Sequence, residues 1–220
     1  MHKIRVWDLP VRSFHWTLVM LVIAAVVTQK IGGAAMIWHF RCGYSILTLV
    51  LFRIVWGMQG TLYARFSEFR HAPSVIIAYL KSWTSAHQGQ QYLGHNPVGG
   101  LAVFGFLAIL ALQAVSGLLS NDANESEGPF AKLVGNQWSD RFTWFHQEIG
   151  ATLLYVFITT HVAAIAYYAY RKNNLVTPMI NGDKWTALGA MPADDSPGNR
   201  LMALLILILC AAAVWVIVQV

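Results

Sequence analysis

The stretch RFTWFHQEIGATLLYVFITTHVAAIAYYAYRK, residues Arg141–Lys172, decides the fold. Between its charged ends it is almost continuously apolar, and it exceeds the roughly 20 residues that a helix needs to cross a bilayer. Two histidines, His146 and His161, interrupt the apolar run. Ionisable side chains inside a membrane are costly, so their presence indicates a function.

The composition of the whole chain agrees with a membrane protein. Of its 220 residues, 56% are hydrophobic and only 11% are charged, which lies outside the range of ordinary soluble domains. We expect one all-α transmembrane bundle over residues 1–220, because only helices satisfy their own backbone in lipid. The expected spans are residues 13–29, 38–57, 97–119, 142–170 and 201–220.

Lysine and arginine are distributed unevenly over the loops. Ten precede the first span or lie in the second and fourth loops, whereas three lie in the first and third loops. Because cytoplasmic loops carry the excess of positive charge, we expect a cytoplasmic N-terminus and, after five spans, a C-terminus on the outer side. The first span is expected to remain as an anchor, since four more follow it. The pI of about 9.4 is explained by this topology, without nucleic acid as a partner.

Four histidines fall inside the expected spans, and the topology gives each a depth. His39 and His146 lie near the outer face, and His15 and His161 lie nearer the cytoplasm. The fifteen residues from His146 to His161 correspond to about 22 Å along a helix and leave the two rings about 60° apart around it. We therefore expect two pairs, His39 with His146 on the outer side and His15 with His161 on the inner side.

Two histidines on facing helices at one depth can bind the iron of a haem between them. The sequence therefore predicts two stacked haem sites. Gly43 and Gly150 each follow an outer histidine by four residues and are expected to leave room for the macrocycle. Arg41 and Arg53 are candidate counter-charges for the haem propionates, with snorkelling to the membrane interfaces as the alternative.

Other roles of the histidines stay open, namely hydrogen bonding between helices, a zinc site or a proton relay. Tetrahedral zinc would need further ligands at the same depth, where only Glu148 is near. A relay would need neither paired depths nor adjacent glycines. Cys42 and Cys210 lie in apolar runs, form neither CxxC nor CxxCH, and are assigned to packing.

Several motifs in order resemble the bacterial di-haem cytochrome b family, which includes the cytochrome b subunits of nickel–iron hydrogenases and is related to bacterial cytochrome b561. The motifs are IRVWDLPVRSFHW from residue 4, FRCGYSILTLVLFRIVWG from residue 40, ARFSEFRHAP from residue 64, YLGHNPVGG from residue 92 and THVAAIAYYAYRKNNLVTPMINGDKW from residue 160. The resemblance implies a four-helix core that binds two b-type haems, with ligand positions that map onto His15, His39, His146 and His161. The fifth, C-terminal span is additional to that core.

The resemblance also implies a function in the bacterial inner membrane. Members carry electrons between a periplasmic redox partner, such as a hydrogenase or a c-type cytochrome, and the membrane quinone pool. The fifth span and the GHNPVGG loop differ from the smaller superoxide-handling relatives. From the resemblance we expect an electron-transfer subunit. Two alternatives stay open, a quinone-linked superoxide oxidase and a haem-free anchor subunit, so enzymatic activity is left undecided.

The loops add weaker expectations. The acidic loop 120–141, with Asp122, Glu125, Glu127 and Asp140, would either dock a partner or be a solvated loop. Residues 73–83 are expected to form a helix along the membrane interface. His71, His87 and His95 would either serve a quinone site or be ordinary surface histidines. Residues 181–199 are expected to form a flexible linker.

Overall fold

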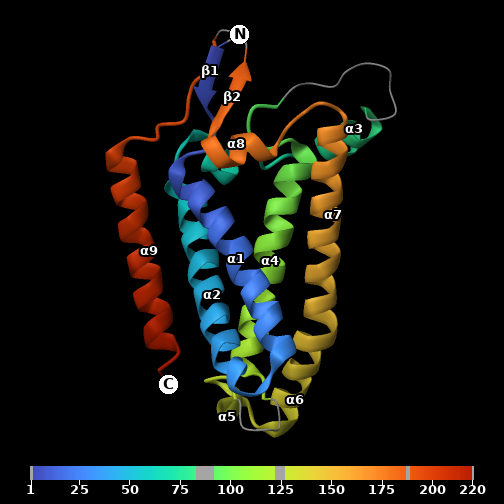
Figure 1. The fold of residues 1–220 in the computed structure, drawn as a ribbon, viewed down its shortest axis with the longest axis vertical. Coiled ribbons are helices and arrows are strands. Elements are labelled where there is room, and N and C mark those ends of the chain that lie inside the picture. The colour runs from blue at the N-terminus through green and yellow to red at the C-terminus, as the bar shows by residue number, and fades with distance from the viewer. Residues whose placement is uncertain (1, 83–91, 122–126, 187–188, 220) are drawn as a thin grey trace.

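The computed structural model describes residues 2–82, 92–121, 127–186 and 189–219, and its long helices run side by side (Figure 1). Within these residues, five helical segments are long and apolar enough to cross a membrane. They are α1 (Leu9–Ile31), α2 (Met36–Gln59), α4 (Pro97–Leu119), the continuous series α6 (Asn136–Trp144), η4 (Phe145–Gly150) and α7 (Ala151–Tyr170), and α9 (Pro197–Ile217). The expected all-helical membrane bundle is confirmed.

Three of these helices begin in the same way, with a polar N-cap and a proline in the first turn. The Asp8 side chain accepts a hydrogen bond from the Val11 amide (2.7 Å), and Asn96 accepts one from the Gly99 amide (2.7 Å). Ser196 caps α9 at the Asn199 amide (3.5 Å). The caps satisfy amides that have no partner inside the helix, and proline fits the first turn because its missing N–H is not needed there.

The helices extend beyond the predicted spans at several ends. The fourth begins at Asn136 instead of residue 142, after Gly135, whose φ of 74° is accessible to glycine. The first begins four residues earlier than predicted, and the fifth covers Pro197–Ile217 instead of 201–220. Hydropathy marks the apolar part of a helix, whereas the hydrogen-bonded helix continues through its polar first turns.

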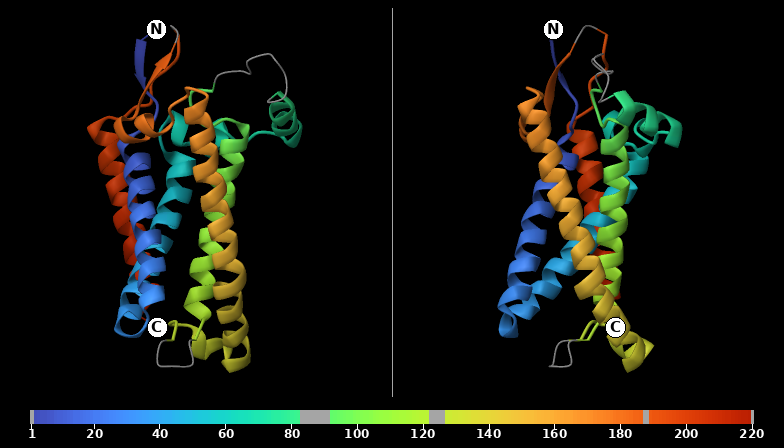
Figure 2. Two further views of the ribbon diagram at one scale, coloured as in Figure 1. Left: turned by 45° about the vertical axis from the view of Figure 1, so that its right-hand side comes forward. Right: turned by 90° about the vertical axis from the view of Figure 1, so that its right-hand side faces the viewer.

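Helix α2 lies at the centre of the arrangement and packs against α1, α4 and α9, while α4 packs against α7. Helix α9 lies on the far side of α2 from α7, outside the group formed by α1, α2, α4 and α7 (Figures 1 and 2). The two cysteines, Cys42 on α2 and Cys210 on α9, are free and buried. Helix α9 is thus an addition to a four-helix core.

The end of the bundle that carries the N-terminus is closed by a two-stranded antiparallel sheet (Figure 1). Strand β1 (His2–Arg5) pairs with β2 (Asp183–Thr186), with His2 opposite Thr186. The Asp195 carboxylate contacts Arg5 (3.5 Å), Arg12 (3.7 Å) and Arg200 (3.0 Å). Within residues 181–199, the strand 183–186 and Asp195 make these contacts, so this part of the segment is structured where a flexible linker was predicted.

The shorter elements complete the two ends of the bundle. Helix α3 (Pro73–Ser82) corresponds to the helix expected over residues 73–83, of which Trp83 lies outside the described residues. Helix α8 (Val176–Asn181) and α3 lie at the same end as β1 and β2, and α5 (Ala131–Val134) lies at the opposite end (Figure 1). The remaining turns are the 3-10 segments η1 (Gly33–Ala35), η2 (Leu62–Ala64) and η3 (Phe66–Glu68).

Asp8 connects this end of α1 to α2. Its side chain is buried, and its second carboxylate oxygen accepts hydrogen bonds from Trp56 Nε1 (3.1 Å) and Thr61 Oγ1 (2.5 Å). Trp56 is fully buried as well. A buried carboxylate is stable only when its oxygens are hydrogen-bonded, and here both are. Asp8 thereby fixes the start of the helix that carries His15.

Candidate cofactor-binding site

The structure brings the four intramembrane histidines together in two pairs. His39 on α2 and His146 in η4 have ring centroids 6.0 Å apart, with ring planes at 86°. His15 on α1 and His161 on α7 have ring centroids 6.5 Å apart, with planes at 52°. We call these the outer pair and the inner pair, following the predicted topology.

The spacing within each pair fits two imidazoles on opposite sides of one metal ion. A metal–imidazole bond is about 2.0 Å long, so two such ligands have ring centres roughly 6 Å apart. Direct hydrogen bonding between two imidazole nitrogens would bring the nitrogens to about 3 Å and leave no room for an ion. In the part of the chain that the structure describes, neither pair forms such a hydrogen bond between its two rings.

Both rings of the outer pair are held by backbone carbonyls. His39 Nδ1 lies 2.9 Å from the Ala25 oxygen, and His146 Nδ1 lies 2.9 Å from the Gln113 oxygen. A carbonyl only accepts, so each Nδ1 carries the hydrogen and donates it. Each Nε2 then keeps its lone pair, which is the state that a metal ligand requires, and the carbonyl fixes the orientation of the ring.

His146 lies in a π-helical turn, Phe145–Gly150, inside an otherwise α-helical span. Its carbonyl accepts from the Ala151 amide, five residues on, and from Gln113 Nε2 on α4 (2.9 Å). Turns of this kind occur mostly as single bulges and are frequent at functional sites. Gln113 was not singled out from the sequence, although it is an amide side chain within an almost wholly apolar span.

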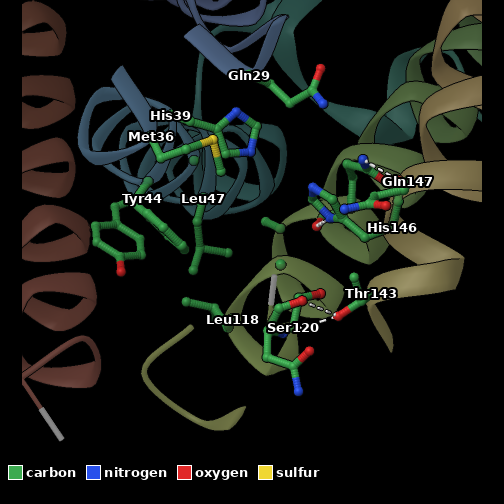
Figure 3. Close-up of a pocket in the computed structure, with 16 residues that line it drawn as sticks. Gln29, Met36, His39, Tyr44, Leu47, Leu118, Ser120, Thr143, His146 and Gln147 are labelled. Atoms are coloured by element: carbon green, nitrogen blue, oxygen red, sulfur yellow. Dashed lines mark hydrogen bonds between the residues drawn. The ribbon is translucent and has the colours of Figure 1, made fainter. Parts of the chain in front are cut away.

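A pocket opens beside the outer pair, and the side chains of both its histidines line it (Figure 3). Its other walls include Met36, Gly43 and Gly117. A Cβ at Gly43 would meet no atom within 4 Å, so this glycine faces open space as expected. A Cβ at Gly150 would instead collide with Gln113 Oε1, so the space beside that glycine holds the glutamine side chain.

The inner pair has a different surrounding. His15 Nδ1 is buried and has no hydrogen-bond partner among the described residues. The contacts that orient the rings are aromatic, with Trp16 at 4.9 Å from His15 and Phe106 at 5.5 Å from His161, each nearly perpendicular. These edge contacts restrict the rings without fixing which nitrogen carries the proton.

The two candidate arginines differ sharply in environment. Arg53 is 2% exposed, lies 5.0 Å above the Phe66 ring, and leaves its Nη1 without a partner among the described residues. Arg41 is exposed and lies 4.7 Å from the Trp38 ring. A buried guanidinium with a free donor is unfavourable unless an anion pairs with it, whereas the exposed Arg41 needs none.

Two more basic groups lie near Arg53 at the same end of the bundle. The His95 ring packs against Trp7 (4.7 Å) and Phe69 (4.4 Å), and its buried Nδ1 has no partner among the described residues. Burial, with the positive charges of Arg53 and Lys184, lowers the pKa of His95 to about 3. Burial also lowers the pKa of Lys184, which donates to the Leu93 carbonyl at 2.7 Å.

The other sequence candidates are less informative. His71 has a buried Nε2 without a partner among the described residues, and His87 lies outside them. In the outer loop, Glu127 pairs with Lys132 at 3.5 Å and Asp140 is exposed, while Asp122 and Glu125 lie outside the described residues. Within the described part of the chain, no group of three or more His, Cys, Asp or Glu side chains gathers as a site for a bare metal ion such as zinc would require.

The fold and the site define a class of protein, a multi-pass helical bundle with histidines paired between facing helices. The model of the family described as prokaryotic cytochrome b561 matches residues 6–182, and the chain belongs to that family. It is therefore a transmembrane b-type cytochrome of electron transport, and haem b is its implied cofactor. The match ends before α9, in agreement with the peripheral position of that helix.

Several curated relatives match nearly the full length of the chain. A probable Ni/Fe-hydrogenase B-type cytochrome subunit of Azotobacter chroococcum mcd 1 is 28% identical, covering 87% of this chain and 90% of the relative. Proteins described in the same way are 26% identical in Cupriavidus necator (80% and 85%) and, as the hydrogenase 1 subunit, 22% identical in Escherichia coli K12 (80% and 88%). No solved structure matches the chain.

Proposed function

We propose that this chain is a di-haem b-type cytochrome that carries electrons across the bacterial inner membrane, between a redox partner on the periplasmic face and the quinone pool. His39 and His146 would bind the outer haem, and His15 and His161 the inner haem. The observation that carries this proposal is the presence of two imidazole pairs at metal-bridging distance, at two depths of one bundle. Each haem supplies reversible one-electron chemistry.

The surrounding residues support two haems in specific ways. The outer histidines have their Nδ1 hydrogens committed to Ala25 and Gln113, which leaves Nε2 for iron. Gly43 leaves open space in the outer pocket for a macrocycle. The unpaired Nη1 of the buried Arg53 suits a carboxylate such as an inner-haem propionate, and Arg41 is the corresponding candidate on the outer side.

The helix from His146 to His161 gives the two sites an axial separation of about 22 Å. Between α1, α2, α4 and α7 apolar side chains pack together, among them Leu18, Val50, Leu110 and Leu154, and we expect them to keep water away from the route. The protein's own contribution is to hold the rings in place before any electron arrives, so that little reorganisation accompanies transfer. The two sites together would thus span most of the hydrocarbon layer, which is about 30 Å thick.

The partners follow from the relatives and the charge distribution. The relatives are described as hydrogenase cytochrome subunits, so a hydrogenase is the proposed outer partner, with a c-type cytochrome as the alternative. The positive-inside distribution supports a cytoplasmic N-terminus and a periplasmic C-terminus. Quinone would bind at the inner end, where His71 and His95 have buried nitrogens without partners among the described residues.

The proposal is tested by haem quantitation and reduced-minus-oxidised spectra of the purified protein and of four variants. The wild type should hold two haems per chain, and His15→Ala, His39→Ala, His146→Ala and His161→Ala should each hold about one. The two variants that affect the same histidine pair should lose the same component of the spectrum. The control His2→Ala, in β1, should keep two. An absence of b-type bands in the wild type would identify a haem-free anchor and overturn the proposal.

The assignment of a partner requires a second experiment. Purification from membranes in mild detergent should retain hydrogenase subunits, and reduction of the haems should follow addition of hydrogen. Rapid superoxide consumption by the isolated chain, without any retained subunit, would instead favour a quinone-linked superoxide oxidase.

A further inference from the structure

Gln113 contacts His146 in two independent ways. Its backbone oxygen accepts the His146 Nδ1 hydrogen at 2.9 Å, and its side-chain Nε2 donates to the His146 carbonyl at 2.9 Å. Ser116 Oγ, one turn further along α4, also donates to the Gln113 oxygen (3.0 Å) and lies 3.2 Å from His146 Nδ1. One residue of α4 therefore holds both the ring and the backbone of His146.

We propose that Gln113 is a positioning residue for the outer haem site: it holds the π-helical turn through its side chain and the His146 ring through its carbonyl, which keeps the outer rings nearly perpendicular. This inference rests on the proposed function, because it takes His146 to be an axial ligand. It also assigns a role to Gly150, which leaves room for the Gln113 amide.

The need for such a residue follows from the π-turn. The wider turn changes the direction in which His146 points relative to an α-helix. Because such turns are rare inside α-helices, we expect neighbouring groups to hold this one in place. The Gln113 amide supplies a second donor to the His146 carbonyl, in addition to the Ala151 amide. Gly150 permits this contact, because a Cβ there would collide with Gln113 Oε1.

The ring orientation has a spectroscopic consequence. Each axial imidazole interacts through π orbitals with one of two iron d orbitals, so perpendicular rings make these orbitals nearly equal in energy, and parallel rings separate them. The EPR signal of a low-spin ferric site is accordingly more anisotropic when the rings are perpendicular. The outer pair, at 86°, should give a more anisotropic signal than the inner pair, at 52°.

The test uses the full-length haem protein with Gln113→Met, which keeps the length of the side chain and removes the amide. The outer EPR signal should become less anisotropic or broader, and the outer haem should dissociate about 10–100-fold faster, as is typical when the group that orients a ligand is lost. The inner signal should not change and serves as the internal check of folding. The neighbouring control Leu112→Ala, on a lipid-exposed position of α4, should leave both signals unchanged.

A double-mutant cycle separates the two roles of Gly150. If this glycine makes room for Gln113, Gly150→Ala should disturb the outer signal alone, and should have little further effect in a Gln113→Ala background. If Gly150 makes room only for the macrocycle, the two substitutions should act additively, and the role assigned here to Gln113 and Gly150 is overturned.

Failure of this inference is distinguishable from failure of the proposed function. A wild type without two haems, or a His146→Ala variant that retains both, would refute the function. Two normal haems with an outer signal unchanged in Gln113→Met would refute the inference alone. If Gln113→Met loses all haem, the EPR spectrum of the wild type still tests the inference. Two wild-type signals of equal and low anisotropy would contradict an outer pair held perpendicular.

Discussion

The outer and inner histidine pairs have the same composition and similar spacing but are held by different means. In the outer pair each ring donates to a backbone carbonyl, and one ring lies in a π-turn braced by α4. In the inner pair, among the described residues, the rings contact aromatic side chains edge-on, Trp16 beside His15 and Phe106 beside His161. The outer site is thus fixed by hydrogen bonds, whereas the rings of the inner site are held by packing.

The largest expected effect tests whether the open space at the outer pair holds a macrocycle. In Gly43→Leu, the new side chain would enter the pocket without meeting atoms of the protein near its Cβ, so the polypeptide should remain folded. We expect nearly complete loss of the outer haem and retention of the inner haem, measured by pigment content per chain. Gly43→Ala is the control and should retain most of the outer haem. Full outer occupancy in Gly43→Leu would show that the macrocycle lies elsewhere.

The next effect tests whether the inner site depends on the packing at the start of α1. Asp8→Ala removes an N-cap and leaves Trp56 Nε1 and Thr61 Oγ1 without their buried acceptor, which should lower the free energy of unfolding by about 3 kcal/mol. In a urea titration followed by the haem spectrum, the inner component should be released first. The exposed Asp140→Ala should change stability by less than about 0.5 kcal/mol. Equal release of both components would contradict the dependence of His15 on Asp8.

The smallest effect concerns pH at the inner end. Because burial and the charges of Arg53 and Lys184 lower the pKa of His95 to about 3 from its ordinary value of 6.5, the unfolded chain binds a proton that the folded chain does not. This contribution to stability is complete above pH 6.5 and is lost as the pH falls toward 3. Between pH 7 and pH 5 the wild type should therefore lose about 2 kcal/mol more than His95→Gln, measured by thermal unfolding in detergent. Parallel pH profiles would show that His95 titrates normally.

The sequence predicted the five spans and the histidine pairing because both depend on local regularities. Span length follows from apolar runs, and ring depth follows from the fixed rise of a helix. The helix ends were less accurate, since a polar first turn such as that from Asn136 has no hydropathy signal. The strand within residues 181–199 could not be predicted locally, because the partner of β2, which is β1, lies about 180 residues away in the sequence.

The supporting residues were harder to predict than the histidines. The role of Gln113 depends on a π-turn in another helix, and neither feature is encoded by spacing alone. A glycine four residues after a histidine was expected to leave open space beside it. Gly43 does so, but at Gly150 the π-turn changes the helix geometry on which this expectation depends. The two arginines looked equivalent near opposite ends of one span, and only packing distinguishes the buried Arg53 from the exposed Arg41.

The pairing of β1 with β2 also bears on how the protein is made. A ribosome adds about 5–20 residues per second, so β1 leaves it roughly ten to forty seconds before β2 exists. During that interval α1 enters the bilayer without the strand pairing that later secures its N-terminal end. The helices that precede β2 must therefore remain in the bilayer, with β1 unpaired, until β2 has been synthesised and completes the sheet.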